Sequence, residues 1–251
     1  ETNRRIVDII SDVNLCYSEH ARRYLMECGL PKERIFVTGS PMAEVLHANL
    51  DKIEASDVHK RLELTKGQYI LLSAHREENI DTDCNFLQLF TAVNAMAERY
   101  DMPILYSCHP RSRKRLEATG FRLDSRVIAH EPLGFHDYNC LQMNAFAVVS
   151  DSGTLPEESS FFLSIGKPFP AISIRTSTER PEALDAGCFV LAGIDAESLL
   201  QGVEMAVQMQ REGCFGTPVA DYTGENVSMK AARLIQSYTG VVNKMVWRKG
   251  R

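Results

Sequence analysis

Four clusters of polar and charged residues have the chemistry to recognise an anionic ligand, and each follows a run of apolar residues. They are Ala-His-Arg-Glu-Glu-Asn at 74–79, Ser-Cys-His-Pro-Arg at 107–111, Ser-Asp-Ser-Gly at 150–153 and Arg-Thr-Ser-Thr-Glu-Arg at 175–180. A histidine can donate or transfer a proton near neutral pH, and an arginine offers paired donors to phosphate oxygens. Ligands of doubly wound sheets bind at the carboxyl ends of the strands. The clusters therefore indicate a ligand site along one sheet edge.

The cluster at 150–153 comes just before an expected helix. Ser152 offers a hydroxyl, Gly153 lets the backbone approach an anion, and the N-terminus of the helix favours a phosphate. Glu158, one turn into the helix, can accept hydrogen bonds from ribose hydroxyls. A simpler interpretation stays open, in which Ser152 only caps the helix and the acidic residues occupy its favourable first turn.

Two histidines lie in the neighbouring clusters. We expect His75 and Arg76 to face phosphates bound at the next strand end, with a solvated loop as the alternative. His109 is a candidate ligand contact, whereas Cys108 is interpreted as structural, because adjacent side chains of a strand point to opposite faces.

Arg180 lies in the fourth cluster and can reach an anionic ligand. We expect Glu179 or Glu182 to fix its orientation. The alternative is an exposed Glu–Arg pair, which contributes little to stability.

The elements that would position these clusters alternate along the chain. Strands are expected at 13–17, 34–38, 69–73, 103–107, 126–130, 145–149, 171–174 and 189–192, and helices at 19–28, 85–100, 111–119, 136–144, 155–163, 196–211 and 225–238. This alternation predicts βαβ units and a Rossmann-like parallel sheet in an α/β fold.

The polar segment at 52–66 is the best candidate for a domain junction. The residues before it hold one βαβ unit, which is too little for a closed core. The chain also starts at Glu1 without an initiator Met. We therefore expect residues 1–42 to be the end of a first domain whose larger part is absent.

Composition narrows the function classes. The chain has 251 residues, 44% hydrophobic and 24% charged, and a formal net charge of −5, as in an ordinary soluble protein. No stretch approaches the ~20 apolar residues of a membrane span, and the mild acidity argues against a nucleic-acid partner. The histidine spacing suggests no metal site, and no dinucleotide or Walker motif occurs. We expect no cofactor. Seven scattered cysteines predict buried, reduced thiols and a cytoplasmic location.

Taken together, the motifs resemble the non-hydrolysing UDP-N-acetylglucosamine 2-epimerase family. The similarity rests on Asn-Arg at 3–4, Phe-Val-Thr-Gly at 36–39, the clusters at 74–79 and 150–153, Glu-Pro-Leu at 131–133, Glu-Glu at 157–158, Gly-Lys-Pro at 166–168 and Thr-Glu-Arg-Pro-Glu-Ala at 178–183. These motifs follow the family's order and span nearly the whole chain, which makes the set specific.

The resemblance implies two Rossmann-like domains in the GT-B arrangement. Residues 1–42 would finish the first domain, 43–220 would form a UDP-binding domain, and 221–251 would cross back to the first. The family converts UDP-GlcNAc to UDP-ManNAc without NAD or metal: UDP is eliminated to give a 2-acetamidoglucal and then adds back. A UDP-sugar substrate, a homodimer and a role in cell-surface polysaccharide synthesis are implied in the same way.

The resemblance also assigns roles to single residues. The implied catalytic residues are His75 and Arg4. The implied substrate-binding residues are Arg76, His109, Phe135, Tyr138, Ser152, Gly153, Glu158 and Arg180, with the two aromatics beside the uracil, Glu158 on the ribose and Arg180 on UDP.

Some family residues are missing or changed. The family's Lys near its start, its catalytic Asp and its first catalytic Glu would precede residue 1, and only the second of its paired Glu is present, as Glu1. Thr154 stands where many members have a second Gly, Pro156 where they have Gln, and Leu133 where some have a polar residue. We therefore expect this chain alone to bind UDP but to turn over little or not at all.

Four other functions stay open. The C-terminal sequence at 238–249 resembles a capsule-pathway branch that epimerises C2 of a UDP-2-acetamido-2,6-dideoxyhexose on the way to UDP-L-FucNAc. A GT-B glycosyltransferase or a hydrolysing 2-epimerase would share the nucleotide site. A UDP-sugar binding module without catalysis is the remaining alternative.

Overall fold

The computed structural model describes residues 2–76, 79, 82–175 and 177–249. The chain divides into two compact units, one made of Glu1–His47 with Val219–Arg251 and the other of Ala48–Pro218.

The larger unit is built around a six-stranded sheet in the part of the chain that is described. In spatial order its strands are β5 (Val127–His130), β4 (Ile104–Ser107), β3 (Ile70–Ser73), β6 (Ala147–Ser150), β7 (Ala171–Ile174) and β8 (Val190–Ala192). Every neighbouring pair is parallel. The chain runs outward from β3 to β5 and then returns to place β6 on the other side of β3, so the direction of winding reverses between β3 and β6. Such a switch point is where open α/β sheets bind ligands.

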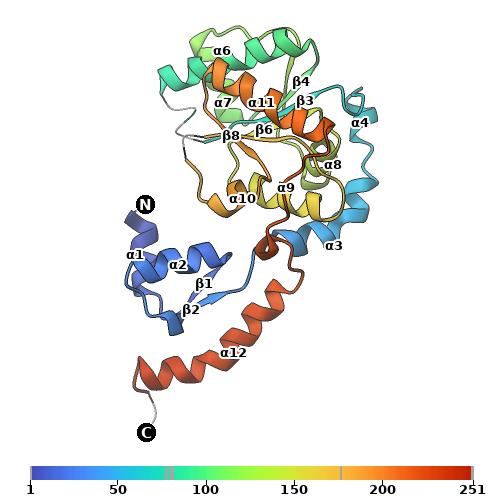
Figure 1. The fold of residues 1–251 in the computed structure, drawn as a ribbon. Coiled ribbons are helices and arrows are strands. Elements are labelled where there is room, and N and C mark those ends of the chain that lie inside the picture. The colour runs from blue at the N-terminus through green and yellow to red at the C-terminus, as the bar shows by residue number, and fades with distance from the viewer. Residues whose placement is uncertain (1, 77–78, 80–81, 176, 250–251) are drawn as a thin grey trace. The chain divides into compact units, whose positions relative to one another are not determined.

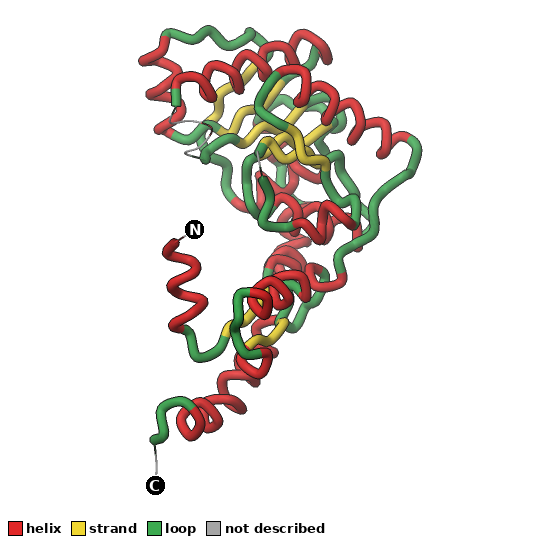
Figure 2. Tube along the Cα trace, turned by 60° about the vertical axis from the view of Figure 1, so that its left-hand side comes forward, coloured by secondary structure: helices red, strands yellow, loops and turns green. Residues whose placement is uncertain are grey.

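Helices cover both faces of this sheet, which explains why its central strands are apolar throughout (Figures 1 and 2). One face carries α6 (Asp83–Tyr100), α7 (Pro110–Thr119) and α11 (Ala196–Arg211), and the other carries α8 (Phe135–Met143), α9 (Leu155–Ser164) and α10 (Pro181–Asp185). α6 begins where the Thr82 hydroxyl accepts a hydrogen bond from Asn85 N, and it ends at Asp101 in a left-handed conformation. Gly202 lets α11 lie close to β8, because a Cβ there would sit 3.0 Å from the Cβ of Ala192.

The smaller unit holds a short parallel pair within its described residues, β1 (Asn14–Cys16) beside β2 (Ile35–Val37). Its helical elements are α1 (Thr2–Ile10), α2 (Glu19–Glu27), η1 (Lys32–Arg34), η2 (Ala220–Tyr222) and α12 (Val227–Met245). The core beside the strand pair is small, formed by Cys16, Leu25 and Ile35. Apolar side chains of α1 and α12 stay exposed, including Ile10 and Met245. An apolar groove of about 240 Å³ lies between β1 and α12.

The parallel α/β fold predicted from the sequence is confirmed, but some element bounds were wrong. The helix expected at 225–238 runs as α12 to Met245. Among the described residues, the helices α1, α3 (Met42–Glu54) and α4 (Val58–Arg61) were not predicted. α3 enters the polar segment expected as a junction, and α4 lies inside it. Polarity alone did not separate an exposed helical face from a linker.

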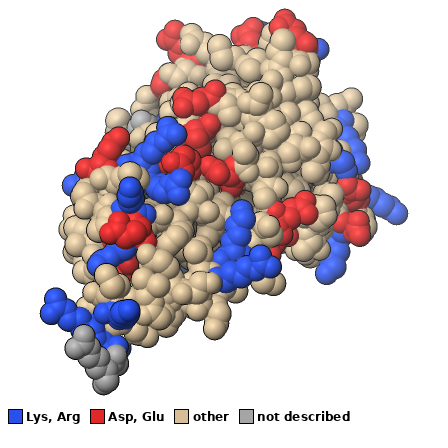
Figure 3. All heavy atoms as spheres, turned by 60° about the horizontal axis from the view of Figure 1, so that its bottom comes forward, with Lys and Arg blue, Asp and Glu red and all other residues tan. Residues whose placement is uncertain are grey.

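The cysteines differ in part from the expectation of buried thiols. Cys28, Cys84 and Cys214 are exposed, so only some of the thiols are buried. No helix among the described residues is long and apolar enough to cross a membrane. On the face drawn in Figure 3, basic and acidic side chains gather in mixed groups rather than in one basic patch.

Candidate functional site

A row of buried serines marks the carboxyl edge of the sheet. In the strand registers, Ser73 lies opposite both Ser107 and Ser150, and Ser150 lies opposite Ser173. All four are at most 4% exposed. Residues opposite one another in neighbouring strands share a face, so their hydroxyls line one side of the edge. The row begins the polar surface on which the clusters predicted from the sequence converge.

Asp151 holds the two loops of the switch point together. Its carboxylate, 1% exposed, accepts hydrogen bonds from the backbone N–H groups of His75 (2.9 and 3.1 Å) and Arg76 (2.9 Å). The Asn79 amide donates to the same carboxylate (3.1 Å) and to Ile174 O at the end of β7 (3.2 Å). One side chain after β6 thus fixes the loop after β3, and its amide partner reaches the end of β7.

His75 lies where this loop leaves β3. Its Nε2 is 2.8 Å from Ser73 Oγ, and its ring meets the His109 ring edge-on, with the centroids 6.2 Å apart. Partial desolvation lowers the pKa of His75 below its usual value; the Asp151 charge opposes this shift and His109 adds to it. A neutral imidazole near neutral pH can donate one hydrogen bond and accept another.

Arg76 folds back over the turn that follows β6. Its Nε donates to Asp151 O at 2.8 Å, and one terminal nitrogen lies 3.8 Å from a Glu179 oxygen. A Cβ at position 153 would lie 3.3 Å from another guanidinium nitrogen, so Gly153 makes room for the cation. The guanidinium therefore lies against the turn predicted to hold a phosphate.

The turn after β6 is stabilised by serine hydroxyls. Ser152 N donates to Ser150 Oγ at 3.0 Å, and Ser152 Oγ accepts from Thr154 N at 3.3 Å. α9 begins at Leu155 with Thr154 as its N-cap, so the interpretation of Ser152 as the cap is wrong. In the described residues the Thr154 side chain makes no capping bond either.

Glu158 is a buried carboxylate one turn into α9. It is 8% exposed; Oε1 accepts from Thr154 Oγ1 at 2.7 Å, and Oε2 from the Gln142 amide at 3.0 Å. Burial raises its pKa, whereas the hydrogen bonds from Thr154 and Gln142 lower it and the Glu157 charge adds to the rise. A carboxylate held in this way is oriented to accept further hydrogen bonds, as the predicted ribose contact requires.

Arg180 pairs with a residue that the sequence did not suggest. Its Nε and Nη2 donate to Glu157 Oε1 at 2.9 and 2.8 Å. Glu179 instead forms a bidentate pair with buried Arg175, and the Arg175 hydrogen bonds lower the pKa of Glu179 to about 2. The Glu179 carboxylate therefore does not orient Arg180, although Arg180 Nη1 donates to Glu179 O at 3.2 Å; the carboxylate on the Arg180 guanidinium is that of Glu157, on α9.

The two aromatic candidates lie on the first turn of α8. Phe135 is 41% exposed, so its ring is accessible to a planar ligand. Tyr138 is half-buried; burial raises the pKa of its hydroxyl, and hydrogen bonds with Ser73 and Ser150 oppose this shift. Tyr138 therefore connects α8 to the serine row.

The remaining candidates are less closely tied to this edge. His109 is exposed and caps α7, where its Nδ1 accepts from Arg111 N at 3.3 Å. Arg4 lies on α1 in the smaller unit, and its role stays a prediction. Of the clusters predicted from the sequence, Glu77, Glu78 and Thr176 lie outside the described residues, as does Glu1.

Sequence reasoning missed Asp151, Thr154 and Gln142 as site residues. A carboxylate directly after an apolar strand was a usable signal for Asp151, since such a group needs donors when it is buried. Nothing in the local pattern links Gln142 to Glu158, because the two meet only when α8 packs beside α9.

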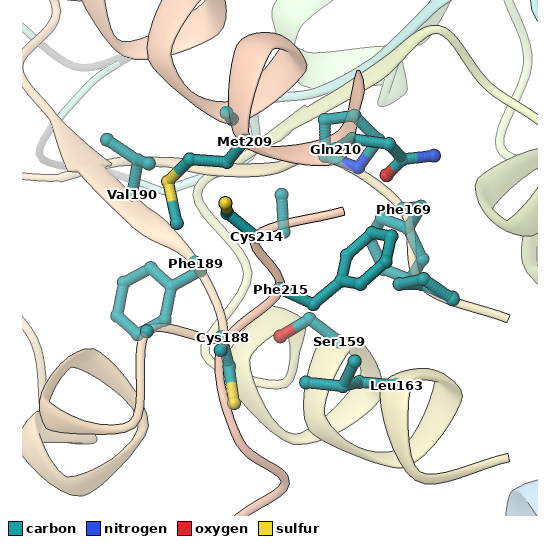
Figure 4. Close-up of a pocket in the computed structure, with 16 residues that line it drawn as sticks. Ser159, Leu163, Phe169, Cys188, Phe189, Val190, Met209, Gln210, Cys214 and Phe215 are labelled. Atoms are coloured by element: carbon teal, nitrogen blue, oxygen red, sulfur yellow. The ribbon is translucent and has the colours of Figure 1, made fainter. Parts of the chain in front are cut away.

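A pocket lies at the amino-terminal edge of the sheet, away from the serine row. It is lined by residues at the start of β7 and β8, including Phe169 and Val190, with Cys214 and Phe215 beside them (Figure 4). Its volume of about 40 Å³ holds a few water molecules, whereas ligand pockets run to roughly 300–1,000 Å³. This pocket cannot take a nucleotide. Among the residues that the structure describes, no cluster of three or more His, Cys, Asp or Glu could hold a metal ion.

Removing the Asp151 carboxylate should destabilise the larger unit. Asp151→Ala leaves N–H donors of the loop after β3 without their acceptor, so we expect a loss of about 2–4 kcal/mol in the free energy of unfolding. Urea denaturation measures it. The matched control is Asp185→Ala, an exposed carboxylate of the same unit, with an expected change within about 0.5 kcal/mol. Equal effects of the two substitutions would contradict the role given to Asp151.

The titration of His75 should report its surroundings. We expect its pKa, followed through the imidazole carbon-bound protons by NMR, to lie below the ordinary value of about 6.5. His109→Ala should raise it, because a like charge is removed, and Asp151→Asn should lower it further, because an opposite charge is removed. Shifts of the opposite sign would show that the two neighbours do not act on His75 in this way.

Comparison with known proteins gives these residues a context. The family model for UDP-N-acetylglucosamine 2-epimerase matches residues 1–236. UDP-N-acetylglucosamine 2-epimerase of Methanococcus maripaludis is 32% identical over 228 residues, which is 88% of this chain and 60% of that protein. The chain thus spans about three fifths of the length of this curated relative.

Solved structures are similar over almost the whole chain. The structure of UDP-N-acetylglucosamine 2-epimerase from Rickettsia bellii is 40% identical and has a TM-score of 0.88 over 99% of this chain and 65% of that one. The Methanocaldococcus jannaschii UDP-GlcNAc 2-epimerase, solved in complex with UDP-GlcNAc and UDP, is 27% identical, with a TM-score of 0.83 over 94% of this chain and 64% of that one. The likeness confirms the expected GT-B-type α/β fold class. With the family match and this likeness together, the chain belongs to the UDP-N-acetylglucosamine 2-epimerase family.

Proposed function

We propose that this chain is the UDP-binding part of an enzyme that converts UDP-GlcNAc to UDP-ManNAc. The observation that carries the proposal is the polar edge at the switch point, where Asp151 holds the His75 loop against the turn at 150–153. The relative from Methanocaldococcus jannaschii, solved with UDP-GlcNAc and UDP, supports the same ligand class.

The residues at this edge match the parts of a UDP-sugar. The turn at Ser152 and Gly153, with the N-terminus of α9 behind it, suits the diphosphate, and Arg180 adds a cation held by Glu157. Glu158 suits the ribose hydroxyls, and the accessible Phe135 ring suits the uracil.

The proposed reaction removes a proton from C2 while the C1–O bond breaks, and UDP leaves with the bonding electrons. The product of this step is a 2-acetamidoglucal with a C1–C2 double bond. Return of a proton to the opposite face of C2, with UDP adding back at C1, gives the epimer. In this proposal the described residues bind and stabilise the departing UDP, and neutral His75 hydrogen-bonds the diphosphate as its charge develops.

We propose that the carboxylates that move the C2 proton lie outside this chain. The two-stranded sheet of the smaller unit, its exposed apolar helices and the groove between β1 and α12 support its assignment to a first Rossmann-like domain that needs further elements. In this proposal the domains are 1–42, 43–220 and 221–251. A homodimer, a cytoplasmic location and a role in capsule polysaccharide synthesis belong to the same proposal.

The test compares the full-length protein with the isolated chain in heavy water. With UDP-GlcNAc, the full-length protein should give UDP-ManNAc with deuterium at C2 by NMR, whereas the isolated chain should bind UDP by calorimetry and show no measurable turnover. His75→Gln in the full-length protein should lower kcat by about 10²–10⁴-fold, and His20→Gln, at an exposed position, should leave it unchanged.

Other results would redirect the assignment. An inert C2 in UDP-GlcNAc, with exchange in a UDP-2-acetamido-2,6-dideoxyhexose, would favour the 6-deoxy substrate. Consumption of UDP-sugar only with an acceptor would indicate a glycosyltransferase, and release of free ManNAc a hydrolysing epimerase. Equal epimerisation by the isolated chain and the full-length protein would refute the assignment of catalytic carboxylates to the missing part.

A further inference from the structure

Three side chains form a continuous hydrogen-bonded row from the turn after β6 into α9. Ser152 Oγ lies 2.9 Å from Thr154 Oγ1, and Thr154 Oγ1 donates to Glu158 Oε1 at 2.7 Å. The row therefore joins the proposed phosphate site to the proposed ribose site. Thr154 is its middle member.

The number of protons in this row is limited. An ionised Glu158 has no proton, so the single Thr154 hydroxyl proton is used in the bond to Oε1. Thr154 Oγ1 can then only accept from Ser152, which uses the Ser152 proton. Thr154 N also donates to Ser152 Oγ, at 3.3 Å. In this state Ser152 has no proton left for a phosphate oxygen, which is itself only an acceptor.

Binding of a diphosphate reverses the direction of the hydrogen bonds in the row. If Ser152 donates to the phosphate, Thr154 must donate to Ser152, or two oxygens 2.9 Å apart face each other without a proton between them. When the Thr154 hydroxyl donates to Ser152 instead, Glu158 Oε1 loses its donor, although the Gln142 amide still donates to Oε2. Because Glu158 is only 8% exposed, leaving its Oε1 without a donor costs free energy.

A ribose hydroxyl supplies the missing donor. With diphosphate on Ser152 and ribose on Glu158, every oxygen of the row is satisfied, whereas diphosphate alone leaves Glu158 Oε1 without its bond. We propose that Thr154 is a positioning residue that couples recognition of the diphosphate to recognition of the ribose, so that a nucleoside diphosphate is selected over free diphosphate. This inference rests on the proposed UDP site and specifies how its two halves communicate.

The test measures three ligands on the isolated chain at alkaline pH, which favours the ionised Glu158 that this row requires: UDP by calorimetry, and uridine and inorganic pyrophosphate by NMR titration. The coupling is the product of the uridine and pyrophosphate dissociation constants divided by that of UDP. Thr154→Val, which keeps the shape but removes the hydroxyl, should reduce this coupling by about tenfold, as expected for one hydrogen bond. It should also bind pyrophosphate more tightly than the wild-type chain, because Ser152 is then free to donate.

Thr154→Ser is the matched control, since it keeps the hydroxyl and should retain the wild-type coupling. Thr154→Gly is the second variant without the hydroxyl and should behave as Thr154→Val. If the wild-type chain binds UDP and removal of the hydroxyl leaves the coupling unchanged, the role given to Thr154 is wrong, whereas the UDP site stands. If the folded wild-type chain does not bind UDP, both the proposed UDP site and the role given to Thr154 are wrong.

Discussion

The buried carboxylate of Asp151 is the interaction on which the candidate site depends. At the switch point of a parallel sheet the connections after two neighbouring strands lead in opposite directions, so beyond the strand ends no ladder holds the two loops together. The Asp151 carboxylate does this instead. It accepts hydrogen bonds from the backbone of the loop after β3 and from the Asn79 amide, which also donates to the last residue of β7. His75, Arg76 and the turn after β6 are thereby fixed relative to one another before a ligand arrives, which reduces the ordering that binding requires.

Sheet register supplies the second constraint. Parallel pairing sets Ser73, Ser107, Ser150 and Ser173 opposite one another, so hydroxyls rather than apolar groups end the central strands. Tyr138 and His75 both interact with this row, from α8 and from the loop after β3. The polar edge is thus built from short hydroxyl side chains that longer side chains reach from neighbouring elements.

The fold was predictable because its signals are local. The apolar run at 69–73 and the helical spacing of Phe86, Leu89 and Phe90 give the right elements, since burial on two faces or on one stripe determines them. The position of Ser152, Gly153 and Glu158 at a strand end and a helix start was also predictable, whereas their contacts with a ligand stay a prediction. The partner of Arg180 was not, because Glu157 lies on a different element and only packing brings the two together. The same holds for Gln142 beside Glu158 and for the tie through Asp151, in which carboxylate and backbone donors are more than 70 residues apart. Local pattern carries no information on such pairs.

The most direct measurement of the central claim is a crystal structure of the chain with UDP bound. The account predicts the diphosphate within hydrogen-bond distance of Ser152 and the backbone of Gly153, the ribose on Glu158 and the uracil against Phe135, with the Asp151 hydrogen bonds to the His75 loop unchanged. UDP bound elsewhere on the chain, or bound at this edge with the Asp151 contacts broken, would contradict it.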